Sequence, residues 1–189
     1  MDALALCGSL RKRSLNGAVL RAAGELWAPR GGMRIEPSLG WLPFFNQDVE
    51  ESGVLPPEVA EFRERAGAAG GVLIATPEYA SGTSGVLKNA LEWLVGGGQL
   101  YDKPVALVSA SPSALGGDRA QAWLRETLTM MGARLVADGL LIPQASAKIQ
   151  DGRVVDSATV KELDELLARL YEAGCPRPPS MPEAGRADA

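Results

Sequence analysis

Short apolar runs alternate along the chain with longer segments in which apolar residues recur every three or four positions. The runs predict strands, and the first, third and fourth are apolar at nearly every position, which is typical of strands buried on both faces of a parallel sheet. The predicted strands are Ala3–Cys7, Met33–Pro37, Gly71–Ala75, Pro104–Ser109 and Leu135–Ile142.

Each helical segment carries one apolar stripe with a period near 3.6 residues. The five stripes run over Leu15–Leu26, Val59–Ala66, Leu87–Leu94, Ala120–Met131 and Val160–Leu170. Because strands and helices alternate, the connections between parallel strands should be right-handed crossovers. The pattern therefore predicts an α/β fold built on an open, doubly wound sheet with helices on both faces.

Two segments interrupt the pattern. The long connection Leu39–Pro56 follows the second strand, contains too much proline for a helix, and is expected to form a wall of a ligand site. The last stretch, 175–189, is rich in proline and alanine and is expected to be a frayed tail. We therefore expect a single domain over residues 1–174, a length that one hydrophobic core can serve.

The chain has no histidine, which removes the commonest general base, the Ser-His-Asp and Cys-His arrangements and most zinc chemistry. Catalysis must then depend on a cofactor, and we predict neither a catalytic side chain nor a metal site.

Charge and hydropathy narrow the set of partners. The net charge is −4 and the basic cluster Arg11–Arg13 is short, so we predict no nucleic-acid partner. No apolar run approaches the roughly 20 residues of a membrane-spanning helix. The N-terminus places its apolar run before its basic residues, the reverse of a secretory signal, so a cytoplasmic location is expected, with Cys7 and Cys175 unpaired.

Ligands of an open parallel sheet bind beyond the carboxyl ends of the strands. The first such segment is Gly8–Asn16, in which Ser9, Ser14 and Asn16 supply short polar side chains and Arg11 supplies a bidentate cation. These groups at a helix N-terminus suit a phosphate. The alternative is that Ser14 only caps the helix. The segment matches neither the dinucleotide fingerprint nor the P-loop.

Two further loops follow the third and fourth strands. Thr76–Gly85 is a loop of small residues in which Tyr79 could pack against a flat ring system. The alternative is a plain connection in which Glu78 is solvated. Ser109–Arg119 consists mostly of small or turn-forming residues, and its alternative is a flexible connection with Asp118 as a helix cap. Three such loops at consecutive strand ends favour a binding site.

The strings GSLRKRSLN, LPFFNQD, TPEYASGTSGVLKNALEW and VSASPSALGGDRA, in this order between about Ala3 and Ile142, strongly resemble the NADPH-dependent FMN reductase family. The resemblance implies a flavodoxin-like fold with a five-stranded parallel sheet in the order 2-1-3-4-5. It implies an enzyme in which hydride passes from NADPH or NADH through bound FMN to small acceptors in ping-pong turnover. The acceptors of the family include quinones, free flavin, azo compounds and metal oxyanions.

The resemblance also assigns the FMN contacts. The phosphate residues are Ser9, Arg11, Ser14 and Asn16; the isoalloxazine loop holds Pro77, Glu78 and Tyr79; and the third flavin loop holds Ser109, Ser111, Gly116 and Gly117. The chain departs from the family at Ala80, where asparagine is frequent, and at Ser84, where proline is common. Both positions lie near the expected flavin face, so acceptor preference and turnover rate are open.

By the same resemblance the protein is a homodimer or homotetramer. The helices that often build this interface carry Trp93 and Trp123, and each tryptophan fits the ordinary core equally well. Two other functions remain as alternatives, a flavodoxin-like one-electron carrier and a flavin-free α/β binding protein. Flavodoxin-like carriers are usually more acidic than this chain and lack a basic phosphate loop.

Overall fold

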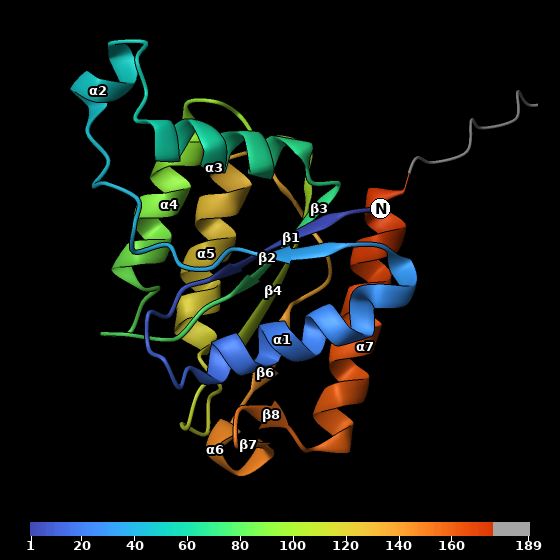
Figure 1. Ribbon diagram of the computed structural model, residues 1–189. Helices are drawn as coiled ribbons and strands as arrows, with labels where there is room; N and C mark the ends of the chain where they lie inside the picture. Colours follow the sequence, from blue (N-terminus) through green and yellow to red (C-terminus); the bar gives the residue numbers. More distant parts are fainter. Residues whose placement is uncertain (176–189) are drawn as a thin grey trace, which may run out of the picture.

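A parallel sheet forms the centre of the molecule in the computed structural model, which describes residues 1–175 (Figure 1). Its strands are β1 (Ala3–Cys7), β2 (Met33–Ile35), β3 (Gly71–Ala75), β4 (Pro104–Ala110) and β5 (Arg134–Leu135). They lie in the order β2-β1-β3-β4-β5, which confirms the predicted flavodoxin-like order. The prediction of a frayed tail falls outside the described residues.

The fifth strand differs from the prediction. Instead of one strand over Leu135–Ile142, the chain forms β5 and a separate β6 (Leu140–Ile142), and both pair in parallel with β4. Between them the backbone turns away, with a φ of 59° at Ala137 and 77° at Gly139. A side chain at Gly139 would collide with the Gln121 amide, so this break needs a glycine.

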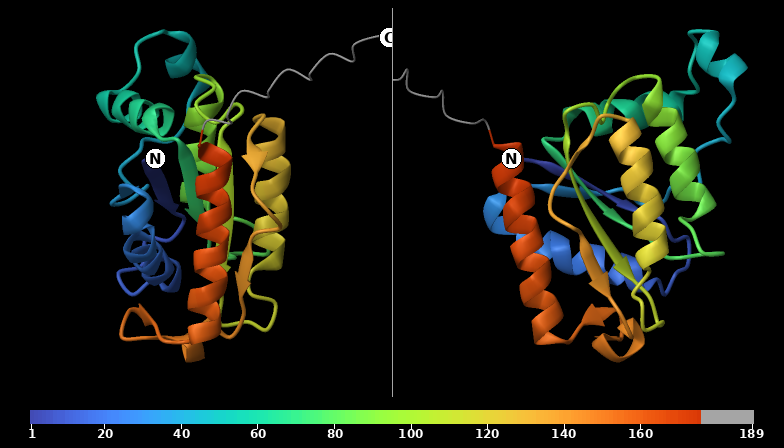
Figure 2. Two further views of the ribbon diagram at one scale, coloured as in Figure 1. Left: turned by 90° about the vertical axis from the view of Figure 1, so that its right-hand side faces the viewer. Right: turned by 180° about the vertical axis from the view of Figure 1, so that it is seen from behind.

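All five predicted helices are present, and they cover two faces of the sheet (Figure 2). The helices α1 (Leu15–Trp27) and α7 (Ser157–Gly174) pack on one face. The helices α3 (Pro57–Ala68), α4 (Gly85–Val95) and α5 (Asp118–Met130) pack on the other. Successive residues of a strand face opposite sides, so the apolar runs of β1, β3 and β4 supply both cores.

The two tryptophans that the sequence left open have different places. Trp93, on α4, is buried in the core, where its indole N–H donates to the Pro43 carbonyl. Trp123 on α5 is 61% exposed and is not part of either core.

The long connection Leu39–Pro56 contains a short helix, α2 (Gln47–Glu51), so the prediction of no helix there was wrong. The prolines stand outside this helix, and the Asn46 side chain caps it by accepting the N–H of Asp48 at 2.9 Å. Figures 1 and 2 show α2 projecting from the body of the molecule. Upstream of α2, the Phe45 ring packs edge-on against Trp93 with 5.0 Å between centroids.

Several elements were too short for a periodicity argument to find. They are the 3-10 turn η1 (Ala28–Arg30), the helix α6 (Ala145–Lys148) and the hairpin of β7 (Ile149–Gln150) and β8 (Arg153–Val154). Cys7 and Cys175 are both unpaired, as predicted. None of the helices within residues 1–175 combines the length and the apolar character needed to cross a membrane.

Candidate functional site

The three loops singled out in the sequence meet at one edge of the sheet, beyond the carboxyl ends of β1, β3 and β4. The Ser9 hydroxyl lies 3.5 Å from the Tyr79 hydroxyl, which joins the first loop to the second. Gly8 packs closely against the second loop, since a Cβ there would stand 3.0 Å from the Ser84 hydroxyl. The topology therefore brings distant segments into one cluster.

In the first loop, Ser14 is the N-cap of α1, and its hydroxyl oxygen accepts the N–H of Gly17 at 3.0 Å. The capping alternative for Ser14 is therefore what the structure shows, although the hydroxyl hydrogen can still serve a second partner. The N–H groups of Leu15 and Asn16 find no acceptor among residues 1–175. Arg11 is exposed, and within the same residues its guanidinium forms no ion pair.

Asn16 is buried, and its amide bonds to the backbone of β4. Its Nδ2 donates to the Ala110 carbonyl, and its Oδ1 accepts the Ala110 N–H, both at 3.0 Å. These bonds join positions 94 residues apart. These two bonds fasten the start of α1 to the end of β4.

The tip of the second loop is a tight two-residue turn. Tyr79 and Gly82 exchange two backbone hydrogen bonds of 3.0 Å, and the residues between them, Ala80 and Ser81, have φ angles of 49° and 61°. Turns of this type favour asparagine or glycine, since other L-residues pay a steric cost at positive φ. This gives a physical reason for the asparagine that the family resemblance implies at the position of Ala80. Tyr79 itself is 45% exposed, and Pro77 beside it is buried.

The third loop is fixed by hydrogen bonds to buried polar side chains. Ser109 is fully buried, its hydroxyl donates to the Gly116 carbonyl at 2.7 Å, and its oxygen accepts the Nε2–H of Gln121 at 3.0 Å. Gly117 has a φ of 93°, and a Cβ there would stand 3.0 Å from the Ser109 hydroxyl. Ser111, half-buried, bonds to its neighbour Ser113 at 3.0 Å.

Gln121 was not singled out in the sequence. The available signal was its spacing, because it stands three and seven residues before Leu124 and Leu128 on the buried face of α5. An amide at such a position must find partners. Here its partners are the Ser109 hydroxyl and the Leu140 carbonyl.

Glu78 connects the second loop to the third. Its carboxylate oxygen accepts the backbone N–H groups of Arg119 at 3.1 Å and of Ala120 at 3.4 Å, at the start of α5. Asp118 is the first residue of this helix and not its cap, because the N-cap is Gly117, which has no side chain. A solvated Glu78, the alternative from the sequence, is therefore not what the structure shows.

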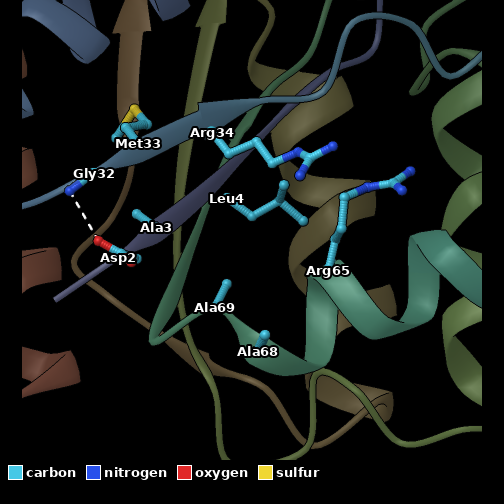
Figure 3. A pocket seen from close by; sticks show the side chains of 9 residues that line it. All are labelled: Asp2, Ala3, Leu4, Gly32, Met33, Arg34, Arg65, Ala68 and Ala69. Carbon is cyan, nitrogen blue, oxygen red and sulfur yellow. Dashed lines mark hydrogen bonds between the residues drawn. The ribbon is translucent and has the colours of Figure 1, made fainter.

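A cavity of about 400 Å³ lies elsewhere, at the amino ends of β1 and β2. Figure 3 shows it bordered by Ala3, Ala68 and Ala69, with the guanidinium groups of Arg34 and Arg65 on one side. Because it lies at the opposite end of the strands from the three loops, it is not the site that the sequence predicts.

The residues at the loop edge fit a planar cofactor that ends in a phosphate. The first loop offers the Arg11 cation, the Ser9 hydroxyl and unpaired N–H groups at a helix N-terminus. The second offers an exposed aromatic ring in Tyr79. The third offers a backbone without side chains at Gly116 and Gly117.

Comparison with known proteins leads to the same kind of cofactor. Residues 1–147 match the family described as NADPH-dependent FMN reductase. The chain is 33% identical over 181 residues to a quinone reductase of Escherichia coli, covering 92% of this chain and 94% of that protein. It is 37% identical over 172 residues to an NAD(P)H-dependent FMN reductase of Pseudomonas aeruginosa, with 88% and 91% covered.

Among solved structures, the flavoenzyme NAD(P)H:(acceptor) oxidoreductase FerB of Paracoccus denitrificans superposes with a TM-score of 0.80. It shares 30% sequence identity, and the match covers 92% of this chain and 96% of that one. A flavodoxin from the Archaea, with a TM-score of 0.60 and 13% identity, shares the fold alone. The order of the sheet, the three loops and these matches together show that the chain belongs to the NADPH-dependent FMN reductase family.

Proposed function

We propose that the protein holds one FMN per chain and passes hydride from NADPH or NADH to small acceptors, with quinones as the first class to test. The observation that carries this proposal is the convergence of the three loops at the carboxyl edge of the sheet, in a chain that belongs to the FMN reductase family. The quinone reductase and the FMN reductase named above support the choice of acceptor. The two unpaired cysteines agree with a reducing, cytoplasmic location.

Each loop has its own part in holding the cofactor. Arg11, Ser9 and the N–H groups at the start of α1 would bind the phosphate, and Ser14 would add its hydroxyl hydrogen. Tyr79 and the backbone of Pro77 and Glu78 would line the ring. Gly116 and Gly117 would let the third loop approach closely.

Bound FMN supplies a ring that accepts hydride from one substrate and gives it to another. The protein contributes orientation and the exclusion of water. No side chain has to act as an acid or base in taking up hydride, which agrees with the lack of histidine.

The nicotinamide has no second nucleotide-binding motif in this sequence, so it should share one surface beside Tyr79 with the acceptor. To test this, flavin extracted from the purified protein is identified by chromatography, and NADPH oxidation is followed with a quinone. We expect FMN, turnover, and parallel double-reciprocal lines at several NADPH concentrations.

Each other result has a definite meaning for the proposal. FAD in place of FMN would contradict the phosphate assignment. Bound FMN without NADPH oxidation would indicate the one-electron carrier, and no flavin at all would indicate the flavin-free binding protein. Intersecting lines would require a separate nicotinamide site.

We further propose that the protein is a homodimer or homotetramer, with one contact on an exposed apolar stripe of α5. This α5 stripe consists of Trp123, Met130 and Tyr101, which are 61%, 67% and 76% exposed. Trp123 and Met130 stand seven residues apart and so share one helix face. Tyr101 lies beside Gly132, just beyond the end of the helix. Exposed apolar groups gathered in this way are typical of an interaction surface.

The stripe is continuous with the second loop, because a Cβ placed on Gly82 would stand 3.9 Å from the indole of Trp123. A second copy on this stripe would therefore stand next to the proposed flavin site. We expect light scattering to show a dimer or tetramer for the natural sequence and a smaller assembly for Trp123→Glu combined with Met130→Glu. Val155→Glu, at a residue that is 54% exposed near β8, is the control and should not change the mass. An unchanged mass in the double variant would exclude this face.

A further inference from the structure

The second and third loops are joined by two contacts, in both of which residues 119–120 donate and residues 78–81 accept. The first contact is the Glu78 carboxylate on the N–H groups of Arg119 and Ala120. The second is the Arg119 guanidinium, whose Nη1–H donates to the Ser81 hydroxyl at 3.1 Å. We call this pair of contacts the loop clasp.

The first contact supplies a helix cap that the local sequence lacks. The helix α5 begins after Gly117, and no side chain at that N-cap accepts a hydrogen bond. The first N–H groups of a helix need such an acceptor, and a negative charge at this end also interacts favourably with the helix dipole. Glu78 provides both from 41 residues away.

The second contact holds a residue of the tight turn that has an unfavourable backbone conformation. Ser81 has a φ of 61° inside the tight turn, a conformation that serine rarely adopts without support. The turn also carries Tyr79, the proposed wall of the flavin ring. An anchor on Ser81 therefore fixes the orientation of that wall.

The hydrogen bonds of the clasp go to backbone N–H groups and to the Ser81 hydroxyl, and none of them involves the first loop, where the phosphate is proposed to bind. We propose that Glu78 and Arg119 are positioning residues, which clasp the second and third loops into one preorganised wall of the FMN site. This inference rests on the proposed function, and it changes the part of the Glu78 side chain from a cofactor contact to a support for α5.

The test compares Glu78→Ala, Glu78→Gln, Arg119→Ala and the Glu78→Ala/Arg119→Ala pair, with Glu58→Ala in the first turn of α3 as a matched control away from the loops. FMN affinity is measured by quenching of flavin fluorescence on the protein stripped of FMN. Without the cap, the start of α5 must be ordered when FMN binds. The loss of a helix cap changes the equilibrium between ordered and disordered helix ends by roughly tenfold, so Glu78→Ala should weaken FMN binding about tenfold. Glu78→Gln keeps an acceptor oxygen and should recover most of the affinity, and Glu58→Ala should match the natural protein.

Two readouts separate positioning from general destabilisation. Amide hydrogen exchange at Arg119 and Ala120 in the flavin-free protein should accelerate in Glu78→Ala, whereas Arg119→Ala should alter exchange around Ser81. The pair of substitutions should weaken FMN by less than the product of the single effects, because both break the same junction. Independent, multiplicative effects would overturn the clasp.

The flavin-free measurements also keep this inference distinct from the proposed function. If the natural protein binds no FMN, the proposed function fails and amide exchange still decides whether the clasp exists. If FMN binds and Glu78→Ala leaves both affinity and exchange at Arg119 and Ala120 unchanged, the clasp is wrong. Should Glu78→Ala fail to fold, Glu78→Gln and Arg119→Ala carry the same comparison.

Discussion

The two ends of the central sheet each use one charged side chain to cap a distant helix, at opposite poles of the helix dipole. At the amino end, the Lys103 ammonium donates to the carbonyls of Ala66, Gly67 and Ala69, where α3 terminates. At the carboxyl end, the Glu78 carboxylate accepts N–H groups where α5 begins. Each charge has the sign that its helix end favours.

The surroundings of the two caps differ. Lys103 follows one residue of positive φ, Asp102 at 52°, and burial lowers the pKa of its ammonium from the ordinary value. Around Glu78 the backbone is irregular, with positive φ angles at Ala80, Ser81, Gly116 and Gly117. Strained backbone of this kind persists where the surrounding contacts hold it, and it is common at binding sites. The comparison indicates that the amino end serves stability and the carboxyl end serves the shape of the site.

The largest expected effect is a loss of stability in Lys103→Met, which tests the amino end of the sheet separately from the carboxyl end. Three carbonyl groups lose a charged donor, so the free energy of unfolding should fall by about 2–3 kcal/mol. FMN affinity of the folded protein should not change, because Lys103 lies at the far end of the strands. Urea unfolding and flavin titration measure the two quantities.

Lys88→Met is the matched control, because Lys88 is exposed and pairs with Glu92 across one helix turn. Its unfolding free energy should change by less than about 0.5 kcal/mol. If FMN affinity fell along with stability in Lys103→Met, the proposed separation between a stabilising amino end and a binding carboxyl end of the sheet would be wrong.

The converse effect is expected for Arg11→Ala. A charge-assisted hydrogen bond contributes about 1.5–3 kcal/mol, so FMN should bind about tenfold more weakly or worse, with little change in the stability of the flavin-free protein. Arg13→Ala, another exposed cation of the same loop, serves as the control and should have a smaller effect.

Ser14→Ala should differ from Arg11→Ala by affecting both stability and FMN affinity, because Ser14 caps α1 and belongs to the proposed phosphate loop. It should lower stability by about 1 kcal/mol through the lost cap as well as weaken FMN. If Arg11→Ala and Ser14→Ala both held FMN as tightly as the natural sequence, the phosphate would have to bind elsewhere.

The smallest effect is a gain in stability from Ala80→Asn. Asparagine tolerates the left-handed region better than alanine, so the substitution should stabilise the folded protein by about 0.5 kcal/mol. Ala60→Asn on the exposed side of α3 is the control, and there the lower helix propensity of asparagine should destabilise by a similar amount. Thermal unfolding of both variants checks the opposite signs, and a loss of stability in Ala80→Asn would contradict the turn geometry.

The sequence alone determined the sheet, the five long helices and the position of the three loops, because these depend on local hydrophobic periods. Short apolar runs such as Gly71–Ala75 are typical of buried strands, and a parallel sheet places the ends of such strands at one edge. The family resemblance then located the candidate site at that edge. The same reasoning missed α2 and the break before β6, because both are set by short-range caps and by the packing of Gln121 against Gly139.

Tertiary structure decided which partners the polar side chains at the loop edge bond to. Asn16, Ser109 and Glu78 look alike as candidate ligands in the sequence, yet their hydrogen-bonding groups engage the backbone of other loops and strands. Their partners lie up to 94 residues away along the chain. A buried polar group is bonded to whatever the fold places beside it, and no local pattern records that neighbour.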